Sequence, residues 1–347
     1  MSNNMKSYKE VLAHLEKSGR QKHLLLGNGF SMSYDHNIFS YNALSNYINN
    51  TEDELLKKLF RIINTTNFEV VMRQLDIFYQ LSKDFLSNED LSKKILTAGN
   101  SLKNSLMSAI TELHPEHVFN VPQEKSIKCA EFLQDYLNSN GHVFTTNYDL
   151  LLYWVLMRNK EHLQNTVDGF GREPIEQEEY KPDSEPEFGD LEWGPNVYAQ
   201  HIYYLHGALH IFDSGTSIIK EIYDGVDCLL SNIMKRIESK EYPVFVTAGN
   251  GNQKKEHILH NQYLDYCYKQ LSSVTGSLIT YGFGFGDYDR HIIEAINKAA
   301  SQKKDHRLWS IYIGVYSDDD IKHIEAIKSK FKCKVNMFDV KTVNIWS

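Results

Sequence analysis

The sequence predicts an α/β protein built on a doubly wound parallel sheet, with a large helical insertion after the first strand. Short apolar runs of the kind found in buried strands alternate with helical patterns along most of the chain. Residues 41–138 interrupt this alternation with helical periodicity and no convincing strand. The 347 residues are 41% hydrophobic and include only 7 prolines, which is enough chain to bury a sizeable core.

The first elements can be assigned in order. A helix is marked at the start by apolar residues at helical spacing, namely Tyr8, Val11, Leu12 and Leu15, and Gly19 can end it. Residues 23–26 form a short apolar strand that leads directly into a glycine turn. The insertion follows, with one apolar stripe within residues 68–85 and another within residues 95–113.

The later strands are expected at residues 142–145, 202–205, 244–247, 278–281, 309–315 and 334–338. The helical patterns between most of them cover residues 150–158, 217–237, 256–271, 288–300 and 318–330. The last begins with Ser317 as N-cap and Asp320 three residues later. This order indicates a Rossmann-like sheet covered on both faces. We expect one domain over residues 1–347, because the first strand finds its partners only after residue 140.

Acidic charge is concentrated in one segment, the loop expected at residues 166–195. Its stretch 173–192 holds nine acidic residues and one basic residue, so the 45 acidic and 37 basic residues of the chain fall to 36 and 36 without it. A solvated surface insertion explains such a charge run, and a lid or binding loop is the alternative. A net charge of −8 disfavours direct binding of nucleic acid.

The sequence predicts no membrane-spanning segment, no secretory signal peptide and no structural metal site. The longest apolar run, residues 150–157, is far too short to span a bilayer, and the first residues have no secretory hydrophobic core. A cytoplasmic protein is therefore predicted. The four cysteines stand far apart without CxxC pairing, which argues against a structural zinc and against a disulfide framework: Cys129, Cys228, Cys267 and Cys333.

Glycine-rich or polar turns follow four of the expected strands, where open α/β sheets bind ligands. The first turn is Gly27-Asn28-Gly29-Phe30-Ser31. Its two glycines allow a tight turn and let backbone amides approach a pyrophosphate. A plain strand-ending turn is the alternative.

The second turn places Thr145, Thr146, Asn147 and Asp149 between a buried strand and an apolar helix. Helix capping by Asn147 or Asp149 explains one polar residue of this kind but does not explain four. The cluster therefore indicates a site as well as a cap.

The third turn is His206-Gly207, where the glycine lets the chain turn and leaves the imidazole exposed. A lone histidine is often a structural residue, and His210 nearby is interpreted as one.

The fourth turn contains Gly282, Gly284, Phe285 and Asp287 and leads into a helix. Its glycines allow close backbone approach. Asp287 or Asp289 could accept a hydrogen bond from a ribose hydroxyl or cap the helix.

Taken in order, the four turns resemble the sirtuin-like NAD-binding domain. The first corresponds to that family's glycine-alanine-glycine-x-serine turn, with Asn28 in the alanine position. Thr145-Thr146-Asn147-Tyr148-Asp149 corresponds to its threonine-glutamine-asparagine-x-aspartate motif, and Leu205-His206-Gly207 to its histidine-glycine motif. Gly282 opens the counterpart of its glycine-threonine-serine strand end. The resemblance covers roughly residues 20–40 and 140–347.

The sequence differs from the sirtuin deacylases at several motifs. The four-cysteine zinc ribbon of the deacylases is missing, Thr146 replaces the glutamine, Phe283-Gly284 replaces threonine-serine, and the proline-aspartate-phenylalanine-arginine stretch is absent. Zinc-free variants with helical insertions look like bacterial sirtuin-like proteins that hydrolyse NAD in anti-phage defence. The resemblance thus implies an NAD+ hydrolase that needs no metal and depletes NAD as a gated effector.

The residue roles follow from the reaction. Nicotinamide leaves NAD+ as a neutral group, so the site has to orient the ribose and place water on its open face. Asn147 can orient either. His206, expected at a pKa near neutrality, can accept a proton from a ribose hydroxyl or from the water. Asp149 can bind the nicotinamide carboxamide and stabilise developing positive charge. Asn147 and His206 are expected to open into one solvent-filled cleft. The residues expected to contact NAD are Gly27, Asn28, Gly29, Phe30, Ser31, Thr146, Gly282, Gly284, Phe285 and Asp287.

Two alternatives remain open. The chain could bind NAD or ADP-ribose as a regulatory or scaffold subunit without turnover, or act as a deacylase or ADP-ribosyltransferase. Because a constitutive NAD hydrolase would poison its own cell, we expect gating in a homo-oligomer or a hetero-complex. The resemblance implies a HerA-type ATPase or a nucleotide-sensing subunit as partner.

Overall fold

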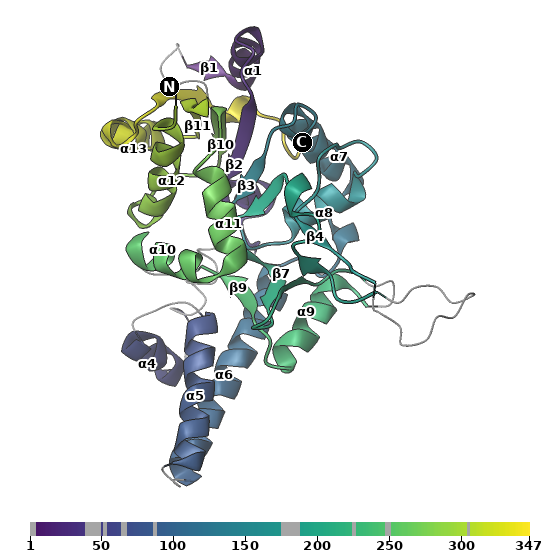
Figure 1. Cartoon of the computed structure of the whole chain (residues 1–347), viewed down its shortest axis with the longest axis vertical. Helices are drawn as coiled ribbons and strands as arrows, with labels where there is room; N and C mark the ends of the chain where they lie inside the picture. The colour runs from purple at the N-terminus through teal and green to yellow at the C-terminus, as the bar shows by residue number, and fades with distance from the viewer. Residues whose placement is uncertain are drawn as a thin grey trace, which may run out of the picture.

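The computed structural model describes residues 5–38, 50, 54–63, 68–85, 89–174, 188–223, 227–246, 251–303 and 306–347. Its main sheet has seven strands in the order β1-β12-β11-β10-β2-β3-β6, and every neighbouring pair is parallel (Figure 1). The strands are β1 Lys6–Ser7, β2 Lys22–Leu26, β3 Val143–Thr145, β6 Ile202–Tyr204, β10 Gly276–Tyr281, β11 Leu308–Val315 and β12 Lys334–Asp339. The predicted doubly wound α/β fold is confirmed.

Helices alternate with these strands as the sequence predicts. They are α1 Tyr8–Lys17, α2 Asn28–Tyr34, α4 Glu54–Ile63, α5 Phe68–Asp84, α6 Glu89–Leu113, α7 Gln123–Leu137, α8 Leu151–Arg158, α9 Leu229–Glu238, α10 Gly251–His260, α11 Gln262–Leu271, α12 Arg290–Ala300 and α13 Asp318–Ile327. The predicted cap of α13 is present, because Ser317 Oγ accepts from Asp320 N at 3.1 Å and Asp320 Oδ2 accepts from Ser317 N at 2.9 Å. In the described chain no helix is long and apolar enough to cross a bilayer.

Burial explains why the central strands are continuous apolar runs. All residues of β2, β3 and β6 are buried, and successive side chains of a strand point to opposite faces, so both faces of the sheet are covered. Helix α7 contacts β2, α11 contacts β6, and α12 and α13 contact β11. From β2 the chain passes to β3 and β6 on one side and later to β10 on the other. The switch point of the sheet therefore lies between β2 and β10.

A second sheet was not predicted. It is antiparallel, in the order β4-β5-β8-β7-β9, and consists of β4 Phe170–Gly171, β5 Glu192–Trp193, β7 Gly207–Asp213, β8 Ile218–Lys220 and β9 Pro243–Phe245. The strand expected at residues 244–247 exists as β9 but belongs to this sheet, and part of the helix expected at residues 217–237 is strand β8. The cause is Gly207, whose φ of 80° turns the chain directly from β6 into β7.

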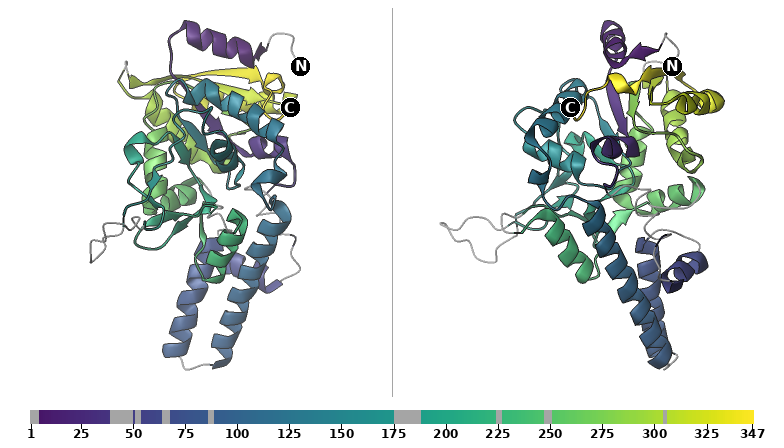
Figure 2. Two further views of the ribbon diagram at one scale, coloured as in Figure 1. Left: turned by 90° about the vertical axis from the view of Figure 1, so that its right-hand side faces the viewer. Right: turned by 180° about the vertical axis from the view of Figure 1, so that it is seen from behind.

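The insertion predicted at residues 41–138 is mainly helical and has no strand where the structure describes it; residues 41–49, 51–53, 64–67 and 86–88 lie outside the described part. Helices α5 and α6 run side by side and project away from the sheets as an arm (Figures 1 and 2). Helix α7, by contrast, packs on β2 and covers the parallel sheet. The protruding part of the insertion therefore ends before α7.

The acidic segment 166–195 contains regular structure towards both ends. β4 and β5 pair within it, Pro174 bridges Phe188, and residues 175–187 lie outside the described part. The two short strands escaped prediction because two residues are too few to show a period of alternation.

Candidate functional site

The four predicted turns lie side by side at one edge of the parallel sheet. Strands β10, β2, β3 and β6 are consecutive neighbours, and their last residues are paired in register, Tyr281 with Leu26, Leu26 with Thr145, and Thr145 with Tyr204. All four strands therefore end at one level. The turns that follow them meet where open α/β sheets bind ligands.

Glycines of the first and fourth turns bring two backbones into contact at the switch point. Gly29 N donates to Gly282 O at 2.9 Å, and a Cβ added to Gly29 would lie 2.6 Å from Gly282 Cα. A Cβ on Gly27 would lie 2.6 Å from Gly282 O, and Gly282 itself has a φ of 66°. These three positions thus require glycine for the contact between the turns, whatever ligand they meet.

This packing changes the expected role of the first turn. The amide of Gly27 donates to Tyr281 O at 3.0 Å, and that of Phe30 donates to Gly27 O at 2.9 Å. With Gly29 also bonded, three amides expected near a pyrophosphate are engaged inside the protein.

Of the remaining residues in the turn, Asn28 is half-buried and its Nδ2 contacts Met32 Sδ at 3.1 Å. Phe30, expected at the ligand, lies in the core with its ring 5.0 Å from Trp346.

A buried chain of hydrogen bonds joins the first and second turns. Asn147 Nδ2 donates to Ser31 Oγ at 2.8 Å, and Ser31 Oγ donates in turn to Asp149 Oδ2. Asn147 and Asp149 are 5% and 2% exposed, and Ser31 is fully buried. The backbone N–H of Asn147 donates to Thr145 Oγ1 at 3.1 Å. The Asn147 carboxamide is therefore fixed at the edge of the sheet.

Thr146 ties the second turn to β2 instead of facing a ligand. Its amide donates to Leu26 O at 3.1 Å, its hydroxyl lies 3.4 Å from the same oxygen, and it is buried.

Asp149 has a structural task that its predicted role did not include. Its Oδ1 accepts from Leu151 N at 2.9 Å at the start of α8, and its Oδ2 accepts from Ser31. Both oxygens are thus engaged inside the protein, so the structure gives no support for a direct contact with a carboxamide. Burial raises the pKa of Asp149 to about 6, while its hydrogen bonds to Ser31 and Leu151 act in the opposite direction.

The raised pKa of Asp149 predicts a pH-dependent stability. A carboxyl whose pKa is higher in the folded state stabilises the fold below its unfolded pKa, and this contribution is lost as the pH rises towards 6. Asparagine does not titrate, so only the wild type loses stability as the pH rises. We expect the unfolding free energy of Asp149→Asn minus that of wild type to increase by about 2–3 kcal/mol from about pH 4 to pH 7. Urea unfolding of both proteins across this range measures the gain. Parallel pH curves would contradict the assignment.

His206 lies at the junction of the two sheets, between β6 and β7. Its Nε2 is 2.8 Å from His291 Nε2, and its ring centroid is 6.5 Å from that of Tyr148. Burial places the pKa of His206 well below its usual range, and the neighbouring His291, Lys254 and His257 lower this pKa further. The expectation of a pKa near neutrality is therefore wrong. The imidazole is neutral at physiological pH, and its lone pair is a weaker base than that of an exposed histidine.

The expectation that Asn147 and His206 open into a solvent-filled cleft is wrong, because Asn147 is 5% and His206 2% exposed. Two contacts that the sequence pattern does not reveal bury them. The first and fourth turns meet backbone to backbone, and the chain after His206 continues into the second sheet.

The fourth turn divides into parts with different surroundings. Gly284 is exposed, with open space around an added Cβ, and Asp287 is also exposed. Phe285 is buried between Phe283 and Phe331, with ring centroids 4.7 and 5.2 Å away. Asp289 does not cap α12 through its side chain; its Oδ1 lies 3.4 Å from Lys254 Nζ.

Sequence reasoning missed His291 and Lys254. Lys254 is 1% exposed and lies on α10, and His291 is fully buried in the first turn of α12. The one available signal was that each follows a glycine-rich stretch after a strand. The described residues contain no group of three or more His, Cys, Asp or Glu side chains that could bind a metal ion.

A comparison with protein families gives a match over most of the chain. A family described as a domain of unknown function (DUF4917) covers residues 24–346, which include all four turns. The chain belongs to the DUF4917 family. No curated protein matches it.

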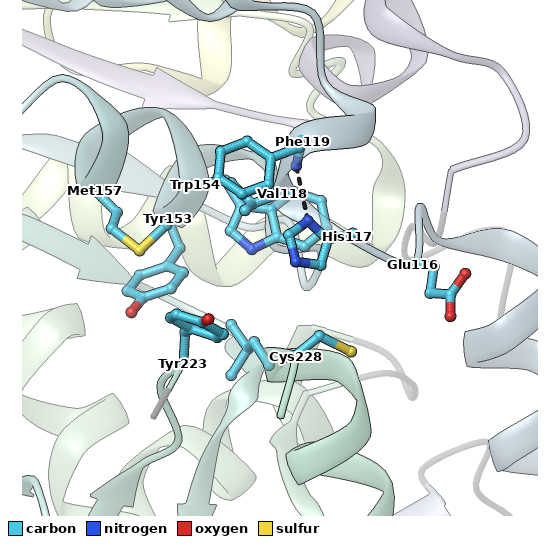
Figure 3. Close-up of a pocket in the computed structure, with 10 residues that line it drawn as sticks. Glu116, His117, Val118, Phe119, Tyr153, Trp154, Met157, Tyr223 and Cys228 are labelled. Atoms are coloured by element: carbon cyan, nitrogen blue, oxygen red, sulfur yellow. Dashed lines mark hydrogen bonds between the residues drawn. The ribbon is translucent and has the colours of Figure 1, made fainter. Parts of the chain in front are cut away.

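This DUF4917 chain also has an apolar surface hollow that the sequence did not predict (Figure 3). About 460 Å³ of empty space, part of it open to solvent, lies between α8, the start of α9 and the 3-10 turn Val118–Asn120. Its lining includes Tyr153 and Trp154 of α8, two and three residues after the first residue of that helix. His114 lies close by in the chain, and its Nε2 accepts from Leu150 N at 3.0 Å. The insertion is therefore bonded to the residue that follows Asp149.

Proposed function

We propose that the protein hydrolyses NAD+, breaking the bond between nicotinamide and ribose to give nicotinamide and ADP-ribose. The observation that carries the proposal is the level edge formed by the ends of β10, β2, β3 and β6. The four turns on this edge follow the chain order of the sirtuin-like motifs they resemble. They also lie beside the switch point, where nucleotides bind in related architectures.

Two side chains on this edge suit the reaction. Because nicotinamide departs as a neutral group, the chemistry depends on orienting the ribose and delivering a deprotonated water, not on a general acid. Asn147, fixed by its bond to Ser31, supplies a preoriented carboxamide for water or ribose. His206 supplies a neutral imidazole. Asp149 acts indirectly in this scheme, by fixing Ser31 and the start of α8.

The burial of Asn147 and His206 is compatible with an enzyme that is inactive until a partner opens its site. NAD+ can reach Asn147 and His206 only after neighbouring side chains move, because both are buried in the free chain. We propose that assembly with further copies, or with a HerA-type ATPase or nucleotide-sensing subunit, promotes this opening in a cytoplasmic defence effector. The arm offers a contact surface, since α5 exposes large apolar side chains at Ile77, Phe78 and Leu81, and Phe85 directly after it is also exposed.

A second candidate is a subunit that binds NAD or ADP-ribose without turnover. The internal bonds of Asp149 favour this alternative, because they engage both oxygens of a side chain that was expected to take part in turnover. A deacylase or ADP-ribosyltransferase remains a third and weaker alternative.

Product analysis distinguishes the candidates. Purified protein is incubated with NAD+, and separately with NADP+, over a range of protein concentrations, and nicotinamide and ADP-ribose are quantified by mass spectrometry. We expect equal amounts of both products without an acyl-peptide acceptor, and a specific activity that rises with protein concentration or with the neighbouring gene product. If calorimetry shows binding of NAD+ and no products form at any protein concentration or with the neighbouring gene product, the second candidate is supported. Full activity in a dilute monomer would contradict gating.

A further inference from the structure

Two histidines from distant parts of the chain meet below the edge of the sheet. His206 follows β6, and His291 lies in the first turn of α12, 85 residues later. Their Nε2 atoms are 2.8 Å apart and their ring centroids 5.1 Å apart. Both side chains are buried, at 2% and 0% exposure. The contact is therefore a hydrogen bond shielded from water.

This bond couples the tautomers of the two rings. Two imidazole nitrogens at hydrogen-bond distance share one hydrogen, so one Nε2 donates and the other accepts. If His206 Nε2 donates, the neutral ring has a lone pair on Nδ1; if His291 donates, His206 Nδ1 carries the hydrogen. The proton on the shared bond thus decides whether His206 Nδ1 is a base.

The environment of His206 Nδ1 makes this choice consequential. The atom is buried and has no hydrogen-bond partner among the residues that the structure describes. A buried imidazole without partners is not in itself a ligand site, because both nitrogens of His210 share that condition within β7. His206 differs in position, since it follows the end of a parallel strand, and in having a partner that can fix its tautomer.

We propose that His291 is a positioning residue for His206, accepting the His206 Nε2 hydrogen so that His206 Nδ1 is the base of the reaction. The inference rests on the proposed NAD+ hydrolysis. In the step, nicotinamide leaves with the electron pair of its bond to ribose C1′, and a water oxygen forms the new bond to C1′. The proton of that water passes to His206 Nδ1, directly or through a ribose hydroxyl, and is then released to solvent.

The charged groups around the pair come from several elements. Lys254 and His257 of α10 face His206, Tyr148 lies beside its ring, and Asp289 pairs with Lys254 at 3.4 Å. The positive charge of Lys254 disfavours a lasting imidazolium, and Asp289 partly offsets it. Lys254 thus favours the neutral form of His206 before the step and the release of its proton afterwards.

Two substitutions at His291 separate positioning from simple packing. Glutamine can still accept the His206 Nε2 hydrogen through its Oε1 atom, whereas leucine fills similar space without an acceptor. We expect His291→Leu to lower turnover about 10²-fold or more, and His291→Gln to stay within about tenfold of wild type. Thermal unfolding is recorded for both variants, and His210→Gln serves as a buried histidine control.

The tautomer of His206 can also be measured directly by NMR, without enzymatic turnover. In protein labelled with ¹⁵N-histidine, long-range ¹H–¹⁵N spectra report which nitrogen of each ring carries hydrogen, and His206→Gln identifies the His206 signals. We expect hydrogen on His206 Nε2 in the wild type and in His291→Gln, and a changed pattern in His291→Leu. Hydrogen on Nδ1 in the wild type, or equal turnover in wild type and His291→Leu, would overturn the proposal. An inactive wild type with the expected tautomer would instead count against NAD+ hydrolysis alone.

Discussion

Replacing His206 with Gln is expected to lower nicotinamide release about 10²–10⁴-fold, because the site loses its proton acceptor. Asn147→Ala is expected to cost a comparable factor, since the carboxamide that orients water or ribose is removed. Both residues are buried, so each change should also lower thermal stability. Rates are therefore measured on the folded fraction, at a temperature well below the unfolding transition.

Matched controls separate lost chemistry from lost packing. His210→Gln alters a fully buried histidine of β7. Asn159→Ala alters the buried C-cap asparagine of α8, which donates to Ser126 Oγ at 2.9 Å. Both controls are expected to lose stability but to keep turnover near that of wild type. Normal turnover in His206→Gln and Asn147→Ala, or an equal loss in the controls, would remove the basis for assigning catalysis to this edge.

Gly29→Ala is expected to destabilise the fold by about 3 kcal/mol or more, because the added Cβ would collide with backbone that cannot move alone. That Cβ would lie 2.6 Å from Gly282 Cα, in the contact between the first and fourth turns. Gly282→Ala should be at least as harmful, since its φ of 66° adds backbone strain to a similar collision. Urea unfolding of each variant measures the loss.

Gly284→Ala provides the matched control in the same turn. An added Cβ there meets open space, and the residue does not have a positive φ. Its unfolding free energy should stay within about 0.5 kcal/mol of wild type. If Gly29→Ala and Gly284→Ala were equally stable, the two turns would not be in contact in solution.

The parallel sheet was predictable because its signals are local. Strands β10 and β11 are mainly apolar, β2 ends in three leucines, and β12 mixes polar and apolar residues. Each was placed to within two residues of its structural bounds. The second sheet was not predictable in the same way. β4 and β5 have two residues each, and the pairing of β7 with β9 depends on the backbone at Gly207, where an added Cβ would meet Val244 O at 1.8 Å.

The candidate site likewise has features that the sequence predicts locally and features that depend on long-range packing. The position of each turn follows from where its strand ends, so Ser31, Asn147 and His206 were correctly expected at one edge. Their depth could not be derived from the sequence, because burial depends on contacts such as that between Gly29 and Gly282. The pairing of His206 with His291 depends on the same long-range packing. Spacing of motifs thus predicts which groups share an edge, but not what covers them.

The contact between Phe30 and Trp346 also sets an order of events during synthesis. Trp346 Nε1 donates to Phe30 O at 3.1 Å, and its ring lies 5.1 Å from that of Tyr34, so α2 is clamped by a residue made 316 positions after Phe30. Strand β2 likewise waits for β10. A nascent chain on the ribosome therefore cannot pair β2 with β10 before residue 281 is made, and cannot complete the packing of α2 before residue 346 is made. If the chain consumes NAD+ as proposed, the helix that carries Ser31 takes its final packing only when translation is nearly complete.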